Sequence, residues 1–173
     1  ATDKINQEKS YKRLGYKQGY EFLKTLDLES IINDLTKSTI DKLNAIECPS
    51  GKMPVVIANG FGGVIFHEAC GHSLEATTVS KGTSAFSNLL NTNVATKKVT
   101  LKDNALIPHA YGSNNIDDEG NICKENVLIE NGILKSYLID NLNSKTMNQE
   151  STSSGRRESY KYSPTSRMSN TYL

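Results

Sequence analysis

The sequence predicts an α+β fold, in which helices and one strand come first and a largely antiparallel sheet follows. Three observations support this class. Residues 26–45 have the apolar period of an amphipathic helix, and the apolar run 53–58 leads through glycines into a second helix. From residue 97 onward, short strand-like runs alternate with turns. A chain of 173 residues is long enough to bury a core of its own.

The N-terminal part predicts an arm followed by one long helix. Residues 1–24 are polar and dotted with tyrosines, which is typical of a mobile arm or the tail of a preceding domain. We expect the helix to end near Ala45, because Pro49 and Gly51 break helices. Its apolar face comprises Leu28, Ile31, Ile32, Leu35 and Leu43.

A buried strand is predicted next, at "MPVVIA" (53–58), because this short apolar run is rich in β-branched residues. The turn "NGFGG" follows, and a helix begins at Asn59 or Gly60. The first turn of this helix is apolar, so we expect the helix to be largely buried. The residues of that turn are Val64, Ile65 and Phe66.

Strands dominate the remainder, and Asn131-Gly132 predicts the turn of a hairpin. The expected strands are 97–101, 125–132 and 133–140. A short helix at 141–149, a polar flexible loop at 150–159 and an extended segment at 161–173 complete the order. The acidic "NNIDDEG" predicts a solvated turn, since a calcium loop would need a glutamate where Asn126 stands.

Composition excludes several classes of protein. The net charge of +1 gives no general attraction to nucleic acid or anionic lipid, and no apolar run approaches the ~20 residues of a membrane span. The three cysteines, Cys48, Cys70 and Cys123, fit free thiols in the cytoplasm better than a disulfide framework. A basic and aromatic cluster predicts a solvated or peptide-contacting loop. It comprises Arg156, Arg157, Tyr160, Lys161, Tyr162 and Arg167.

The stretch "GVIFHEACGHSLEA" (63–76) carries the chemistry. His67 and His72 are five residues apart, and on a regular helix their side chains would point about 140° apart. A π-bulge or a kink would make them neighbours. Gly71 is the residue that could yield there, since glycine costs up to ~1 kcal/mol inside a helix.

Two neutral imidazoles suit zinc, and Glu68 stands where a general base is needed. A catalytic zinc also needs a third protein ligand, for which the chain offers Cys70, Glu75, His109 and Cys123. The alternative is an ordinary buried helix that happens to carry two histidines. In that case Cys70 is a small apolar side chain, His109 lies at the surface, and Cys48 and Cys123 are structural. The residues alone leave both interpretations open.

Five motifs in order resemble the TldD branch of the TldD/PmbA family of zinc peptidases, an older label for which is modulator of DNA gyrase. The first motif is "CPSGKMPVVIANGFGGVIFHEACGHSLEA". The others are "KGTSAFSN", "NIDDEG", "LIENGILKSYLIDNLNSKTM" and "GRRESY" followed by "RMSNTY". The resemblance covers about residue 47 to the end.

The resemblance implies a cytoplasmic peptidase that cleaves unfolded or leader-bearing peptides, with no nucleic-acid partner and no membrane. It implies His67 and His72 as zinc ligands, Glu68 as the base, and a cysteine beyond this chain as the third ligand. The implied assembly is a homo-oligomer or a hetero-oligomer with a PmbA/TldE-like subunit. Residues 1–46 then are an arm and helix from an N-terminal domain, and residues 47–173 are the first part of the catalytic C-terminal domain. We therefore expect a fragment of a larger two-domain protein, because the chain also starts at Ala1 rather than Met.

Two alternatives stand beside the peptidase. The first is a non-catalytic interaction or regulatory subunit, and the second is a truncated fragment without activity.

Overall fold

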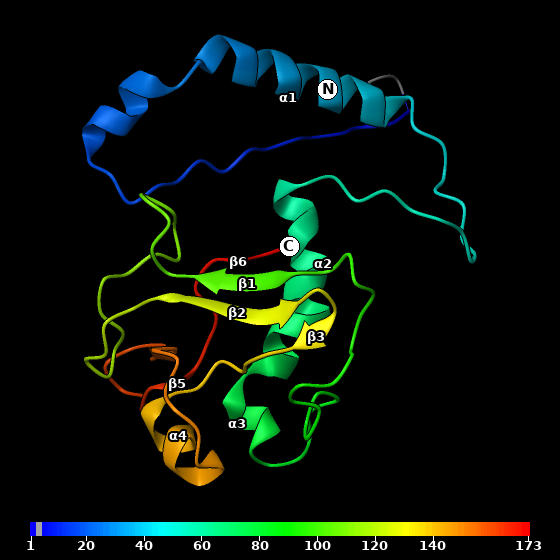
Figure 1. The fold of residues 1–173 in the computed structure, drawn as a ribbon. Coiled ribbons are helices and arrows are strands. Elements are labelled where there is room, and N and C mark those ends of the chain that lie inside the picture. Colours follow the sequence, from blue (N-terminus) through cyan, green and yellow to red (C-terminus); the bar gives the residue numbers. More distant parts are fainter. Residues whose placement is uncertain (3–4) are drawn as a thin grey trace. The chain divides into compact units, whose positions relative to one another are not determined.

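The structure is a computed structural model that describes residues 1–2 and 5–173. The chain divides into two compact units, Ala1–Val55 and Val56–Leu173. Helices and a four-stranded antiparallel sheet together confirm the α+β class (Figure 1).

The first unit contains a 3-10 helix η1 (Tyr20–Thr25) and a long helix α1 (Leu28–Leu43). The Asp27 carboxylate accepts a hydrogen bond from the Ser30 N–H at 3.0 Å, which caps the first turn of α1. The predicted long helix is therefore confirmed. None of its residues is buried. Asp3 and Lys4 of the predicted arm lie outside the described residues.

The second unit begins with a run of short helical segments. These are η2 (Gly60–Gly63), α2 (Val64–Phe66), η3 (His67–Gly71), η4 (His72–Leu74) and α3 (Ala76–Val79). The run starts at Gly60, one of the two residues predicted. The prediction that its first turn is buried was wrong, because Val64 and Ile65 are 41% and 53% exposed.

The predicted strand at 53–58 is also wrong. This segment has no regular structure, and the Val56 side chain is fully exposed. A strand needs a neighbouring strand for its backbone hydrogen bonds, and no described segment pairs with 53–58. High β-propensity alone was therefore insufficient.

The main sheet has the strand order β3-β2-β1-β6, and all of its pairs are antiparallel. Its strands are β1 (Leu101–Asn104), β2 (Glu125–Glu130), β3 (Ile133–Leu134) and β6 (Thr171–Tyr172). The predicted hairpin is confirmed: Asn131 and Gly132 both have positive φ, as a type I′ turn requires. Two predicted strands are misplaced or too long, since β1 starts at the last residue of 97–101 and β3 covers only two residues of 133–140.

The C-terminal part adds α4 (Asn141–Met147) and a small sheet of β4 (Gly155–Arg156) and β5 (Thr165–Ser166). The helix confirms the prediction for 141–149 and is capped by the buried Asp140 carboxylate.

Two polar segments were predicted to be solvated and are instead fixed by hydrogen bonds. Thr152, Ser154 and Gly155, in the predicted flexible loop, are buried. Asp117, in the predicted solvated turn, is 7% exposed. Its carboxylate accepts backbone N–H groups from Glu119 and Gly155. The hydrogen bonds offset the cost of removing these polar groups from water.

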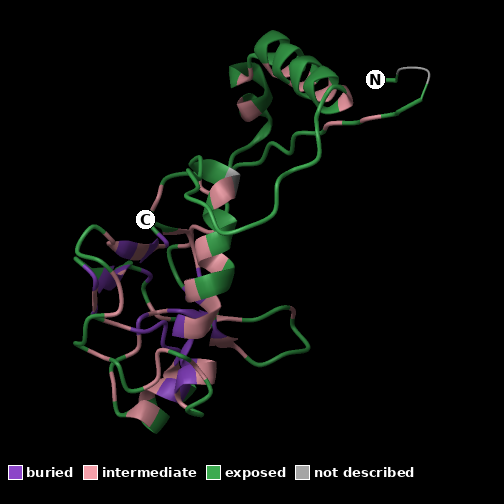
Figure 2. Ribbon diagram, turned by 90° about the vertical axis from the view of Figure 1, so that its right-hand side faces the viewer, coloured by how far each residue is buried: buried purple, intermediate pink, exposed green. Residues whose placement is uncertain are grey.

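One hydrophobic core fills the second unit, between the helical run and the sheet. Leu74, Ala76 and Val79 of the helical run meet Leu101, Leu128 and Leu134 of the strands. Figure 2 shows that buried residues gather at the lower end of the helical run and along the strands. The core therefore anchors the helical run from Cys70 onward and leaves its first turn, with Val64 and Ile65, accessible. No helix in the described part of the chain has the length and hydropathy to cross a membrane.

Candidate metal site

The centre of the site is a five-residue π-helix, η3, that carries His67 and ends just before His72. The His72 N–H donates to the carbonyl oxygen of His67, so the hydrogen bond spans five residues instead of the four of an α-helix. The two imidazole rings lie 4.7 Å apart between centroids and are nearly perpendicular, at 83°. The widened turn therefore makes neighbours of two side chains that a regular helix would point apart.

Glu68 completes the cluster. One nitrogen of each histidine and one Glu68 carboxylate oxygen all lie within 4.8 Å of one another. The His72 Nε2 and the Glu68 Oε2 are 3.8 Å apart. The Glu68 side chain is 66% exposed and that of His72 is 43% exposed. These atoms form a donor set of the kind that metal ions bind, open to solvent on one side.

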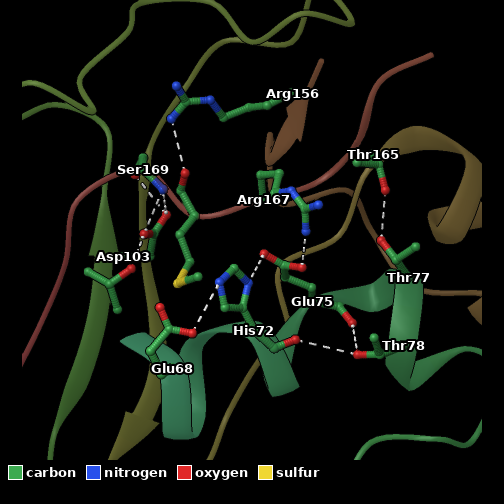
Figure 3. Close-up of polar contacts among 12 residues, drawn as sticks. Glu68, His72, Glu75, Thr77, Thr78, Asp103, Arg156, Thr165, Arg167 and Ser169 are labelled. Carbon is green, nitrogen blue, oxygen red and sulfur yellow. Dashed lines mark hydrogen bonds and ion pairs between the residues drawn. The ribbon is translucent and has the colours of Figure 1, made fainter. Parts of the chain in front are cut away.

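Glu75 contacts the Nδ1 edge of the His72 imidazole ring, and Glu68 lies on the Nε2 side (Figure 3). The His72 Nδ1 and the Glu75 Oε1 are 3.0 Å apart, and the Arg167 Nη1 lies 2.5 Å from the Glu75 Oε2. Glu75 is 2% exposed. Both of its oxygens have partners, and Glu75 is not part of the group formed by His67, Glu68 and His72.

Gly71 is explained by packing rather than by backbone freedom. Its dihedral angles, φ −55° and ψ −57°, are ordinary helical values. A Cβ added there would collide with the sulfur of Met168, a buried residue of the core. The Arg156 Nη1 donates to the Met168 carbonyl oxygen at 3.0 Å. The glycine therefore lets the segment after β5 pack directly against the π-helix.

The remaining third-ligand candidates lie apart from the cluster. Among the described residues, no His, Cys, Asp or Glu besides the three named joins the group. Cys70 packs against the core, and burial raises the pKa of its thiol. His109 is exposed, as predicted, and Cys123 is buried. Cys48 was predicted to be structural, which is wrong, since it is exposed.

Sequence reasoning missed one residue, Arg167. The sequence pattern predicts a solvated or peptide-contacting loop for it, but its guanidinium pairs with the buried carboxylate of Glu75. No local pattern links positions 75 and 167. The only available signal was the presence of a glutamate three residues after His72, which matches the reach of a helical turn.

A groove of about 460 Å³ borders the cluster on the His67 side. Phe66 and Leu101 line it together with Thr171 and Tyr172 of β6. In the described part of the chain, β6 is the last strand of the main sheet and pairs only with β1. Within the described residues, the groove therefore lies beside His67 and along β6.

Comparison with known proteins places this arrangement in a family. Residues 50–173 match the PmbA/TldA metallopeptidase C-terminal domain. A metalloprotease TldD homolog from Buchnera aphidicola (subspecies Schizaphis graminum) is 44% identical over 174 residues, covering 96% of this chain and 36% of the relative. A zinc metalloprotease TldD homolog from Saccharolobus solfataricus is 32% identical, covering 92% of this chain and 36% of the relative.

Solved structures agree with the fold. A candidate modulator of a DNA gyrase from Thermotoga maritima superimposes with a TM-score of 0.73 at 26% identity, covering 86% of this chain and 33% of that protein. TldE from Thermococcus kodakarensis gives a TM-score of 0.69 at 24% identity, covering 85% and 33%. The chain thus spans about a third of the length of these proteins. The chain belongs to the TldD/PmbA family of metallopeptidases.

Proposed function

We propose that this chain carries the histidine pair and the general base of a zinc-dependent peptidase that cleaves unfolded or leader-bearing peptides. The observation that carries the proposal is the π-helix, which gathers His67, Glu68 and His72 within 4.8 Å. π-bulges are rare in proteins as a whole, and those that occur are frequently found at functional sites. An ordinary buried helix has no need of one, whereas a two-histidine metal site with this spacing does.

The donor set fits zinc. Two imidazole nitrogens and a nearby carboxylate are ligand types that Zn²⁺ accepts, and one relative carries the name zinc metalloprotease. His67 and His72 would hold the ion. Bound zinc supplies a water acidified enough to attack a peptide carbonyl near neutral pH.

Glu68 is the general base in this proposal. Its carboxylate is exposed and points into the cluster at 3.8 Å from the His72 Nε2. It accepts a proton from the attacking water and can return one to the nitrogen of the leaving amine. We do not assign this role to Glu75, because its side chain is only 3% exposed and it lies outside the group formed by His67, Glu68 and His72.

The third protein ligand is proposed to be a cysteine outside residues 1–173, as the family resemblance implies. In support, Cys70 and Cys123 both lie outside the His67, Glu68 and His72 group. We likewise propose that residues 1–46 end an N-terminal domain and residues 47–173 begin the catalytic one.

The peptide is proposed to lie in the groove beside His67, extended along β6. The edge of β6 can pair with an extended backbone, and the apolar lining can take side chains. An extended, unfolded segment is the form of peptide that adds to a sheet edge in this way, which supports the proposed substrate class. A bound peptide that contacts the groove through side chains alone, seen in a crystal soaked with substrate, would contradict this placement.

A TldE-like subunit is the proposed partner, as the family resemblance implies. The three free cysteines support a reducing, cytoplasmic location.

A non-catalytic regulatory subunit is the rival function, because a solved protein of this fold is described as a candidate modulator of a DNA gyrase. Glu68→Gln in the protein expressed from its complete gene separates the two. We expect hydrolysis of labelled casein, an unstructured protein, to fall at least ~100-fold, while the zinc content is retained. Glu150→Gln, an exposed control on a different element, should keep full activity. Unchanged activity in Glu68→Gln would remove the peptidase proposal.

A further inference from the structure

We propose that Arg167 and Glu75 are positioning residues that fix the imidazole of His72 with its Nδ1 protonated and its Nε2 free for the metal. This proposal rests on the proposed zinc site. Glu75 had been a candidate third ligand, and the geometry points to a different role. Figure 3 shows the Glu75 carboxylate between the other two side chains, with the Arg167 guanidinium at one oxygen and the His72 imidazole ring at the other.

The first step is the orientation of the ring. The His72 Nδ1 lies 3.0 Å from one oxygen of Glu75, and the His72 Nε2 is the atom that faces Glu68. A carboxylate accepts hydrogen bonds and donates none when ionised. The Nδ1 must therefore carry the proton, and the lone pair of the neutral ring is on Nε2, where a ligand is needed.

The second step is the burial of Glu75. Its side chain is 3% exposed, and a buried carboxylate without a partner costs several kcal/mol. Arg167 supplies that partner through its Nη1 at 2.5 Å and offsets the charge. Removing the guanidinium would leave the carboxylate without its charged partner and free to take another rotamer, which would release His72.

The third step is the rigidity of the two supports. Glu75 lies at the break between η4 and α3, where its backbone is extended at φ −71° and ψ 128°. Two hydrogen bonds with Leu138 fix the adjoining backbone. The Ala76 N–H donates to the Leu138 carbonyl oxygen at 2.8 Å, and the Leu138 N–H donates to the Leu74 carbonyl oxygen at 2.9 Å. The break turns the Glu75 side chain back beneath His72 instead of letting it continue along the helix.

Arg167 is held equally firmly along its backbone. Its N–H donates to the Ser154 carbonyl at 2.9 Å, and its neighbours Ser166 and Met168 are both buried. Met168 also packs on Gly71, directly before His72. The segment that supplies Arg167 thus contacts the π-helix and the glutamate at the same time.

The test uses the protein expressed from its complete gene, with Zn²⁺ affinity measured by competition against a chromophoric chelator. Partners that orient metal ligands typically contribute 10- to 100-fold in affinity. We expect Arg167→Met and Glu75→Gln each to weaken zinc binding about 10-fold or more, and Arg167→Lys to recover part of the loss. Unchanged affinity in Arg167→Met would overturn the proposal.

Arg157→Met is the matched control. Arg157 is exposed in the same region, and its guanidinium donates to the Asp118 carbonyl and not to Glu75. We expect it to bind zinc as the wild type does. An equal loss of affinity in this variant would mean a general disturbance of the segment and would also overturn the proposal. Melting temperatures of the zinc-free proteins report any loss of folding.

A second measurement is independent of zinc. Long-range ¹H–¹⁵N spectra of metal-free, histidine-labelled protein distinguish the two neutral tautomers, with the His72 signals assigned by His72→Gln. We expect the Nδ1–H form in the wild type and a mixture in Arg167→Met. A wild type that binds no zinc but holds the Nδ1–H form would refute the proposed zinc site, while the positioning of His72 by Arg167 and Glu75 would stand. A mixture of tautomers in the wild type would refute that positioning role.

Discussion

The main-chain N–H of His72 donates to the carbonyl oxygen of His67, five residues earlier. This single hydrogen bond accounts for the site. It widens one turn of the helix, so that the two imidazole rings lie 4.7 Å apart. Peptidases with the pattern H-E-x-x-H reach the same result with a regular helix and a spacing of four. Here the extra residue is absorbed by the π-helix and the ligand atoms still converge.

Gly71 tests how the π-helix is packed. Gly71→Ala should destabilise the protein by about 1–2 kcal/mol, because the new methyl group collides with the buried Met168 side chain. Helix propensity favours alanine by up to ~1 kcal/mol and offsets part of this cost. Chemical denaturation would measure the difference.

Gly63→Ala is the matched control for this substitution. Gly63 also has helical dihedral angles, φ −62° and ψ −18°, and no atom lies within 4 Å of an added Cβ. We expect a neutral or slightly stabilising effect there. Equal effects at the two glycines would show that the contact with Met168 does not constrain position 71.

Asp140 should make stability depend on pH. Burial by itself raises the pKa of this carboxyl, but hydrogen bonds from the Ser166 hydroxyl and from Asn143 outweigh burial and hold the pKa below its ordinary value of 3.8. A depressed pKa in the folded state means that the carboxylate stabilises the fold at pH values above 3.8. This contribution is lost as the pH falls through the folded-state pKa, below 3.8.

Asp140→Asn should therefore lower the free energy of unfolding by about 1–3 kcal/mol at pH 7, with a smaller difference from the wild type below pH 3.8. Urea denaturation at pH 7 and pH 3 gives the two values. Glu158→Gln, at an exposed carboxylate, should change neither. A difference between wild type and Asp140→Asn that grows on acidification would contradict the assigned direction of the pKa shift.

The cysteines within the chain should be dispensable for metal binding. Cys70 packs on the core and Cys123 is buried elsewhere in the same unit. Cys70→Ala and Cys123→Ala in the protein from the complete gene should keep the wild-type zinc content, measured by elemental analysis. Loss of zinc in Cys70→Ala alone would make Cys70 a ligand and would require the π-helix to rearrange.

Local sequence patterns predicted the elements that depend on local chemistry. The apolar period from Leu28 to Leu43 gave α1, and Asn131-Gly132 gave the hairpin, because each pattern suits only one backbone geometry. The histidine spacing also raised the π-bulge as one of two ways to unite the pair. The spacing alone could not predict the angle between the two rings or which backbone groups form the hydrogen bond of the turn.

Features that depend on distant partners could not be predicted in this way. The run 53–58 has the composition of a strand, yet no described segment pairs with it. Asp117 and Thr152 lie in polar stretches that predict exposure to solvent. In the structure, the N–H groups of Gly155 and Ile139 donate hydrogen bonds to their side chains. Arg167 reaches Glu75 across 92 positions. Each of these depends on tertiary contacts that no local window contains.

The most direct test of the central claim is the zinc content of the protein expressed from its complete gene, beside His67→Ala and His72→Ala. We predict about one zinc per chain in the wild type, lost in both variants while their circular dichroism spectra remain unchanged. That result would establish that the widened turn unites the two histidines at one ion. A wild type without zinc, or variants that retain it, would contradict the account and return both histidines to a structural role.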